Sequence, residues 1–141
     1  MPTPIQNPVG YAVTRAVAYA DVDGSMIQVA AAAPLPVALG AAASAAPLTG
    51  TANASTVAGP FQPVQGRAAM LVLTGTWSGT VSVTRSVDGG TTRQPLTVNG
   101  NVWGQYTGNV CEAVWEESES AARLYLDITL ASGSVSYRLA Q

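Results

Sequence analysis

The sequence predicts an all-β protein, an antiparallel β-sandwich of about seven strands that follows an extended N-terminal arm. In residues 61–141, short runs alternate between apolar and polar side chains, as half-buried strands do. Glycine, asparagine, aspartate and serine separate these runs at regular intervals, a spacing typical of sandwiches. Residues 1–60 differ, because alanine, proline and glycine dominate them. We therefore expect an arm over residues 1–60 and a sandwich domain over residues 61–141.

The first part of the arm carries a hairpin pattern. Three prolines in residues 1–8 predict an extended lead-in, because proline fixes φ and lacks an N–H donor. Residues 11–20 alternate as a strand does, residues 21–24 (DVDG) are a turn signal, and residues 25–30 return. An isolated hairpin is barely stable in water. We therefore expect a hairpin within residues 10–30 to dock on the sandwich or on a neighbouring chain.

The second part of the arm, residues 31–60, contains no charged side chain. It fits either a flexible linker or an arm that becomes ordered across a partner. Flexible linkers are usually polar or charged, whereas this stretch contains apolar side chains, namely Leu35, Val37, Leu39, Leu48 and Val57. A long stretch without secondary structure is uncommon inside a compact domain. We therefore expect residues 31–60 to lie outside the sandwich.

The sandwich begins with two alternating runs. Residues 67–74 are apolar on both faces and predict a central strand, and residues 80–86 predict a strand with one buried face. Residues 75–79 (GTWSG) form a tight connection between them. Residues 88–90 (DGG) predict a hairpin turn, because glycine supplies the positive φ that such turns require.

Further strands follow at short spacing. Residues 93–98 form the next run, and Pro95 indicates a sheet edge because proline cannot donate to the ladder. Asn99-Gly100 is the strongest short hairpin signal in the chain, and residues 102–107 return from it. The remaining elements are a strand at 109–115, an acidic loop at 116–119, a strand at 122–130, a turn at Ser132-Gly133 and a strand at 134–140.

The alternation also predicts the core. One face of each run carries large apolar side chains, and these faces meet in a two-layer sandwich. The expected core residues are Leu71, Leu73, Trp77, Val81, Val83, Leu96, Trp103, Leu124, Leu126, Ile128, Val135, Tyr137 and Leu139.

Composition excludes several function classes. Charged residues make up only 10% of the chain, against about 25% in ordinary domains, which suggests that other subunits cover much of the surface. The net charge of −2 and the absence of a basic cluster argue against nucleic-acid binding. The N-terminus has no basic and apolar signal segment, and the longest apolar run is broken by Pro34 and Pro36. We expect neither secretion nor a membrane span.

The chain is poor in catalytic groups. It has no histidine, which removes the commonest general base and metal ligand. Cys111 is the only cysteine, so an intrachain disulfide is impossible and a structural zinc site is excluded. No base or electropositive setting is visible for Cys111, and we expect it to be buried and inert. We predict no catalytic, cofactor-binding or metal-binding residues.

Two residue clusters leave alternatives open. The carboxylates Glu112, Glu116, Glu117 and Glu119 fit a solvated loop first, and calcium binding or a subunit ion pair otherwise. The indoles of Trp77, Trp103 and Trp115 fit core or turn packing first, and a sugar-binding groove otherwise.

Three motifs stand out, at residues 75–81 (GTWSGTV), 85–90 (RSVDGG) and 132–141 (SGSVSYRLAQ). Together they resemble a small β-sandwich domain common in virion proteins of tailed phages and prophages. The family pattern has a G-T-W-x-G-T-V strand pair, then R-S-x-D-G-G, and ends with S-G-x-V-x-Y-R-x-x-Q. The family commonly has an aromatic residue after D-G-G-x-T, where this chain has Arg93. The resemblance covers about residues 59–141. The matching positions are Gly75, Thr76, Trp77, Gly79, Thr80, Val81, Arg85, Ser86, Asp88, Gly89, Gly90, Ser132, Gly133, Val135, Tyr137, Arg138 and Gln141.

The resemblance implies a non-enzymatic virion structural protein. We expect a capsid decoration or minor head protein that binds the capsid lattice through its N-terminal arm, forms a homo-oligomer and assembles in the bacterial host cytoplasm. Its partners would be other virion proteins, without a cofactor, nucleic acid or membrane. The alternatives are a tail component (tail-tip, adaptor or fibre-base protein) and a carbohydrate- or receptor-binding module that uses surface tryptophans.

Overall fold

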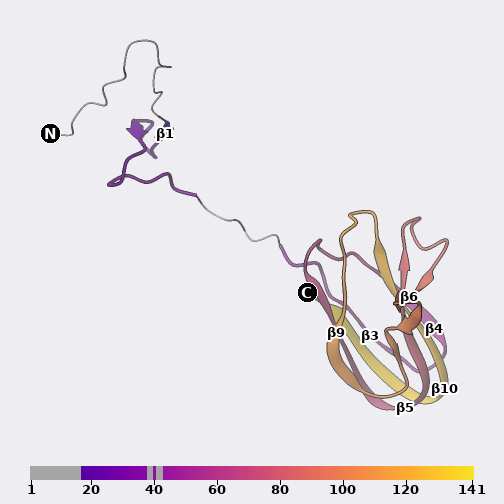
Figure 1. The fold of residues 1–141 in the computed structure, drawn as a ribbon. Coiled ribbons are helices and arrows are strands. Elements are labelled where there is room, and N and C mark those ends of the chain that lie inside the picture. Colours follow the sequence, from indigo (N-terminus) through magenta and orange to yellow (C-terminus); the bar gives the residue numbers. More distant parts are fainter. Residues whose placement is uncertain (1–16, 38–39, 41–42) are drawn as a thin grey trace. The chain divides into compact units, whose positions relative to one another are not determined.

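A computed structural model describes residues 17–37, 40 and 43–141, and its regular elements are all β-strands. The chain divides into two units, residues 1–41 and residues 42–141. The fold is an antiparallel β-sandwich, as predicted (Figure 1). The expected lead-in at residues 1–8 and the first half of the strand at 11–20 lie outside the described residues.

The N-terminal unit contains the predicted hairpin. Strand β1 (Ala18–Ala20) pairs with β2 (Met26–Gln28), and the turn lies at the predicted place. The Asp21 side chain accepts a hydrogen bond from the Val22 N–H at 2.7 Å, and that of Asp23 accepts one from the Ser25 N–H at 2.9 Å. These side chains satisfy the turn backbone, as aspartate commonly does.

Two long strands form the centre of the second unit. Strand β5 (Ala68–Ser86) pairs with β10 (Arg123–Ala140) in antiparallel register from Met70–Ala140 to Ser86–Arg123. Both strands curve back together, so each contributes one half to each layer (Figure 1). The sandwich is therefore one sheet folded over on itself.

The sheet folds over on itself within the two segments where we expected the chain to reverse direction; we call this bend the fold-over. Residues 75–79 lie inside β5, and Ser132-Gly133 lies inside β10 beside a register shift between Leu130 and Ser132. Both turn predictions are wrong, because the glycines bend the strands instead of ending them. Gly75, Gly79 and Gly133 have φ of 127°, 138° and 84°. A Cβ at each would collide with a carbonyl oxygen of the facing strand.

Shorter strands flank the central pair. Strands β3 (Leu48–Ala52) and β4 (Thr56–Phe61) lie along β10, one in each layer. The other side of β5 pairs with β6 (Gln94–Val98), β8 (Gln105–Tyr106) and β9 (Val110–Glu116), and β7 (Asn101–Trp103) pairs with β6.

The domain boundary differs from the prediction. We placed residues 48–60 in the arm, but β3 and β4 belong to the sheet, and the compact unit begins at residue 42. The low-complexity composition concealed these strands because small residues, Ala52 and Ala58, provide most of their buried face. Phe61 is the one large side chain that β4 buries.

The Asn99-Gly100 hairpin is confirmed. Both residues have positive φ, 52° and 79°, and Val98 pairs with Asn101 across them, as a two-residue hairpin turn requires. Gly104 divides the expected strand at 102–107 into β7 and β8. The prediction of a sheet edge at Pro95 is wrong for the strand as a whole, because β6 lies between β5 and β7. Pro95 pairs with Thr84 of β5 but lies beyond the end of the β6–β7 ladder.

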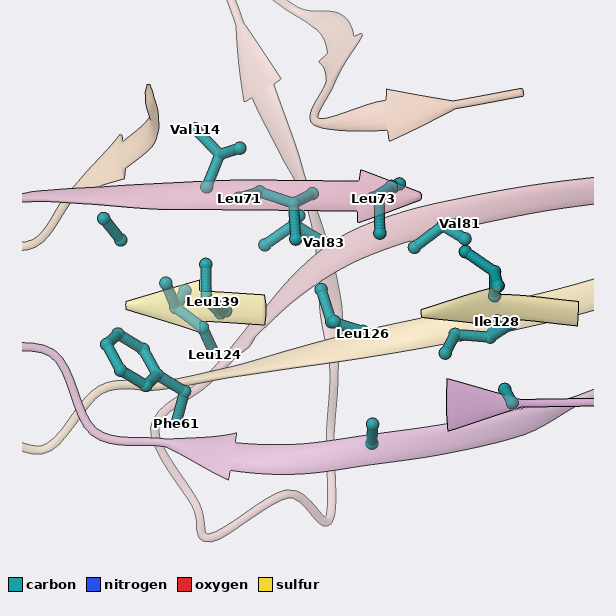
Figure 2. Packing of buried hydrophobic residues seen from close by; sticks show 14 of the residues in the cluster. Phe61, Leu71, Leu73, Val81, Val83, Val114, Leu124, Leu126, Ile128 and Leu139 are labelled. Atoms are coloured by element: carbon teal, nitrogen blue, oxygen red, sulfur yellow. The ribbon is translucent and has the colours of Figure 1, made fainter. Parts of the chain in front are cut away.

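The core fills the space between the two layers (Figure 2). Ten of the thirteen expected core residues are buried, including Leu71, Val83 and Leu126. Trp77 and Tyr137 are partly buried and pack against this cluster. Trp103 is 42% exposed, so its assignment to the core is wrong. The core residues that the alternation missed are mostly small or lie in the presumed arm, namely Ala52, Ala58, Phe61, Ala69 and Val114.

Candidate functional site

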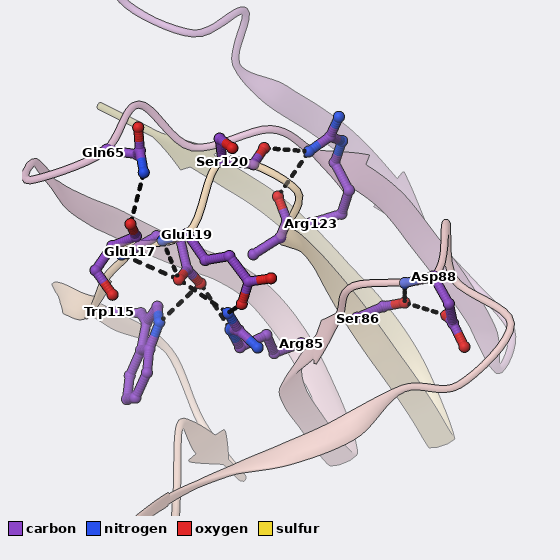
Figure 3. Close-up of polar contacts among 11 residues, drawn as sticks. Gln65, Arg85, Ser86, Asp88, Trp115, Glu117, Glu119, Ser120 and Arg123 are labelled. Carbon is purple, nitrogen blue, oxygen red and sulfur yellow. Dashed lines mark hydrogen bonds and ion pairs between the residues drawn. The ribbon is translucent and has the colours of Figure 1, made fainter.

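A charged network joins β5 to the loop after β9. The Arg85 guanidinium binds the Glu117 carboxylate through Nε at 2.8 Å and Nη2 at 3.0 Å, and Nη2 reaches Glu119 at 2.6 Å (Figure 3). The Glu117 side chain is only 3% exposed. This two-point geometry is the one in which arginine–carboxylate pairs are strongest.

The remaining capacity of Glu117 is also used. Its oxygens accept hydrogen bonds from the Trp115 indole N–H at 3.2 Å and from the backbone N–H groups of Ser118 and Glu119, each at 3.0 Å. The side-chain hydrogen bond from Arg85 is the main cause that lowers the pKa of Glu117 to about 2. The hydrogen bond to Glu117 is likewise the main cause that raises the pKa of Arg85. Glu117 therefore organises the acidic loop, and the interpretation of this residue as solvated is wrong.

The other acidic residues do not join Glu117 as a metal site. Glu112 accepts a hydrogen bond from the Tyr106 hydroxyl at 2.8 Å. In the part of the chain that the structure describes, no three histidine, cysteine, aspartate or glutamate residues are grouped so that they could hold a metal ion. The sequence cluster is thus divided between an internal network and separate surface positions.

The predicted DGG turn is closed by its own side chains. The Ser86 hydroxyl donates to Asp88 at 2.7 Å, and Asp88 accepts the Thr92 N–H at 2.9 Å. These bonds, with Ser86 contributing most, lower the pKa of Asp88 to about 2. Arg93 binds Asp127 at 3.1 Å and lies 5.8 Å above the Tyr125 ring. The Arg93 guanidinium therefore makes both an ion pair and a cation–π contact on the same sheet face.

A cavity of about 420 Å³ lies beside this network. Its lining is mainly apolar, from Val87, Pro95, Leu96 and the Trp115 indole, with a few polar groups among them, as in many small-molecule sites. Its charged groups already have protein partners, because Arg85 pairs with Glu117 and Asp88 closes its own loop. The principal lining residues are Arg85, Asp88, Thr92, Gln94, Leu96 and Trp115.

The three tryptophans do not form one groove. Each indole N–H donates to the protein: that of Trp77 to Asn109 Oδ1 at 2.9 Å, that of Trp103 to the Val114 carbonyl at 2.8 Å, and that of Trp115 to Glu117. Trp77 and Trp115 pack against the core. Only Trp115 lines the 420 Å³ cavity, and only Trp103 is strongly exposed.

The GTWSG segment at residues 75–79 and the Ser132-Gly133 segment meet in space at the fold-over. Trp77 pairs with Gly133, Gly75 with Val135, and Ser78 bonds Ser132 through the two hydroxyls at 2.9 Å. At the chain end, the Gln141 amide bonds the backbone of Val64 and Arg67. These residues therefore stabilise the fold-over and the end of the last strand.

Cys111 is exposed on β9, where it pairs with Val72, so the expectation of a buried thiol is wrong. Sequence reasoning missed this because β9 alternates only weakly. We expect one thiol per native chain to react with a disulfide reagent, because Cys111 is exposed in the folded chain. The absorbance of the thiolate that the reagent releases measures this reaction, and Cys111→Ser is the unreactive control. Reaction only after unfolding would contradict the assignment.

Within its described residues, the N-terminal unit exposes several large apolar side chains. Val17, Val22, Met26 and Val37 are 64%, 103%, 70% and 70% exposed, and Leu35 is 48% exposed. Within the described residues, the hairpin strands pair only with each other. Between residues 17 and 60 the only charges are Asp21 and Asp23. Such a surface is typical of a segment that contacts another protein.

Comparison of the chain with protein-family models, with curated proteins and with solved structures found no match. Among the residues that the structure describes, no helix is long and apolar enough to cross a membrane.

Proposed function

We propose that this protein is a non-enzymatic structural component of a tailed-phage virion, a capsid decoration or minor head protein whose N-terminal arm binds the capsid lattice. The observation that carries the proposal is the arm itself. It holds a short hairpin with exposed Val22 and Met26, followed by an uncharged stretch with exposed Leu35 and Val37. These features favour attachment to an apolar protein surface.

Energetics support attachment in many copies. A two-stranded hairpin alone is marginal, and ordering each arm residue costs about 1–2 kcal/mol of backbone entropy. Burial of the exposed apolar side chains against a partner would offset this cost. Repeated copies on a lattice add an effective concentration that a single contact lacks.

The sandwich supports the same class of function. Its charged pairs, Arg85–Glu117 and Arg93–Asp127, are used for internal stability. Two of the motifs that resemble the phage family, at residues 75–81 and 132–141, meet at the fold-over. The proposed partners are other virion proteins and further copies of this chain, without a cofactor, nucleic acid or membrane. The proposed location is the virion, after assembly in the bacterial host cytoplasm.

The test compares two pairs of substitutions in the full chain. Met26→Asp with Val37→Asp changes the arm, and Val98→Asp with Val102→Asp makes the same chemical change at exposed sites of the sandwich. We expect purified virions to lose most of the arm variant and to retain the control, as measured by quantitative mass spectrometry. Absence of the wild-type protein from virions would refute the proposal. Equal incorporation of both variants would refute attachment through the arm.

Immunogold labelling of the same particles separates head from tail. A label distributed over the capsid supports a decoration or minor head protein. A label confined to the tail would favour the alternative of a tail-tip, adaptor or fibre-base protein.

A second candidate is a carbohydrate- or receptor-binding module. The exposed ring of Trp103 and the 420 Å³ cavity beside Trp115 favour it. A glycan array with the full chain, followed by Trp103→Ala and Trp115→Ala, tests it. Absence of glycan binding removes this candidate.

A further inference from the structure

Strand β3 is an edge strand that lacks the usual protection against pairing with a strand of another molecule. Within the described residues it pairs only with β10, over five regular register positions from Leu139–Leu48 to Val135–Ala52. Its sequence, LTGTA, has no charge and no proline. Proteins usually protect such an edge with charges, prolines, bulges or very short strands, because the unpaired N–H and C=O groups recruit another strand.

The other edges of the same sheet carry such protection. Strand β4 contains Pro60 and has a register shift against β10. Strand β7 has only three residues. Strand β9 carries Glu112 and Glu116, has a register shift against β5, and has its Val114 carbonyl occupied by the Trp103 indole. Strand β3 is therefore the exception.

The β3 sequence is complementary to itself. Leu48, Gly50 and Ala52 are at least half-buried, whereas Thr49 and Thr51 are exposed, so the two sets lie on opposite faces. If two copies pair antiparallel with Gly50 at the centre, Thr49 lies opposite Thr51 of the second copy on the outer face. Leu48 then lies opposite Ala52 on the inner face. Cross-strand threonine pairs are favourable in sheets.

The neighbouring strand supports this register. Thr51 is held by a hydroxyl–hydroxyl hydrogen bond to Ser136 at 3.0 Å. Arg138 pairs with Thr49, and Ser136 pairs with Thr51. The antiparallel arrangement therefore places Arg138 of one copy in the same row as Ser136 of the other, which keeps the two guanidinium groups out of register.

Gly50 at the centre has a structural reason. A Cβ there would collide with the Tyr137 hydroxyl, so the tyrosine ring covers the position where a side chain would stand. Tyr137 itself packs against the core. The backbone of β3 is thus supported from the inner face while its outer edge remains available to another strand.

We infer that β3 is a self-association edge: two copies pair their β3 strands antiparallel about Gly50 and join their sandwiches into one continuous sheet across a twofold axis. A twofold contact of this kind is self-complementary by symmetry. The inference does not rest on the virion proposal, because it uses only the sandwich. The interface is short, so the dimer is concentration-dependent in solution and is reinforced where copies are held close together.

The test uses opposite charges at the paired positions. In the full chain, Thr49→Lys with Thr51→Lys places like charges opposite each other in the dimer, and Thr49→Glu with Thr51→Glu does the same with the other sign. We expect the wild type to dimerise with rising concentration in sedimentation velocity. Each charged variant should be monomeric alone, and a 1:1 mixture of the two should recover the dimer at low salt.

Thr74→Lys is the matched control. Thr74 is exposed in the same row as Thr51 and Ser136, but it lies on β5, two strands from the edge. We expect this variant to dimerise like the wild type. Thermal unfolding checks that all variants fold. If a double variant does not fold, a 1:1 mixture of the single variants Thr49→Lys and Thr51→Glu should dimerise more tightly than either variant alone, because the introduced lysine of one copy then faces the introduced glutamate of the other.

Three outcomes would overturn the inference. The first is a wild-type protein that stays monomeric up to millimolar concentration, as it would if another segment of the chain covered the edge or if the edge bound a different virion protein. The second is a dimer that persists in both charge variants although both are folded. The third is a mixture of the two charge variants that stays monomeric although the wild type dimerises. A virion-bound protein that is monomeric in solution would refute this inference alone and leave the proposed function standing.

Discussion

Replacement of Gly133 by alanine is expected to lower the free energy of unfolding by about 4 kcal/mol. Positive φ costs a residue with a Cβ about 1–2 kcal/mol, and overpacking adds about 1–3 kcal/mol. Both apply at Gly133, where φ is 84° and a Cβ would meet the backbone of Thr76 and Trp77. Backbone atoms of two paired strands cannot move aside separately, so β5 and β10 would have to part at the fold-over.

Gly66→Ala is the matched control for this prediction. Gly66 has a similar φ, 69°, but no atom stands where its Cβ would be. We expect a loss of about 1–2 kcal/mol there, from the backbone conformation alone. Urea unfolding of both variants measures the difference. Equal losses would show that close approach of the strands at Gly133 is not what requires glycine.

Removal of the Glu117 carboxylate is expected to cost about 3 kcal/mol in Glu117→Ala, because it leaves Arg85 and the Trp115 indole with unmet bonds. Glu119 also pairs with Arg85, but its side chain is 52% exposed. Glu119→Ala should cost less than about 1 kcal/mol, as exposed pairs do. Denaturant unfolding at pH 7 compares the two. A larger loss for Glu119→Ala would contradict the central role of Glu117.

Because the pKa of Glu117 is lowered in the folded chain, this residue should make the free energy of unfolding depend on pH. The carboxylate has a lower pKa in the folded chain, about 2, than its usual value of 4.5, so the ionised form stabilises the fold. This contribution is complete above about pH 5 and is lost as pH falls from 4.5 toward 2. Glu117→Gln should therefore flatten the stability profile between those values. A profile as steep as that of the wild type would contradict this assignment.

The sequence predicted the strands where alternation and turn chemistry agreed. The runs around Val81, Val83, Leu124 and Leu126 form strands with the expected buried faces, because a period of two can satisfy only a sheet with one face inside. Asn99-Gly100 forms the expected turn, because few other sequences adopt two consecutive positive φ angles.

The wrong predictions of the turns and of the domain boundary have a common physical cause. Gly75, Gly79 and Gly133 looked like turn residues, but glycine allows both a reversal and a sharp bend, and only the partner strand decides between them. Likewise, Ala52 and Ala58 bury little area each, so their strands were hidden in an alanine-rich stretch. Long-range pairing provides the information that local composition lacks.

The candidate interaction sites were predictable only in part. The exposed apolar residues of the arm, such as Leu35 and Val37, follow from the uncharged sequence. The role of Glu117 does not, because its partner Arg85 lies on a distant strand. The open edge of β3 also required the structure, since an edge exists only once the order of strands is known.

The continuous β5–β10 pair implies an order of folding. Ser86 and Arg123 are the partners closest in sequence, and Met70 and Ala140 are the furthest apart. Loop closure costs least for the closest partners, so pairing starts at that end and proceeds through the fold-over. Strand β3 joins last, because it pairs with residues 135–139, in the half of β10 whose β5 partners are furthest away in sequence. The β3 edge is therefore available only after the fold-over has closed, and association through that edge follows the folding of the sandwich.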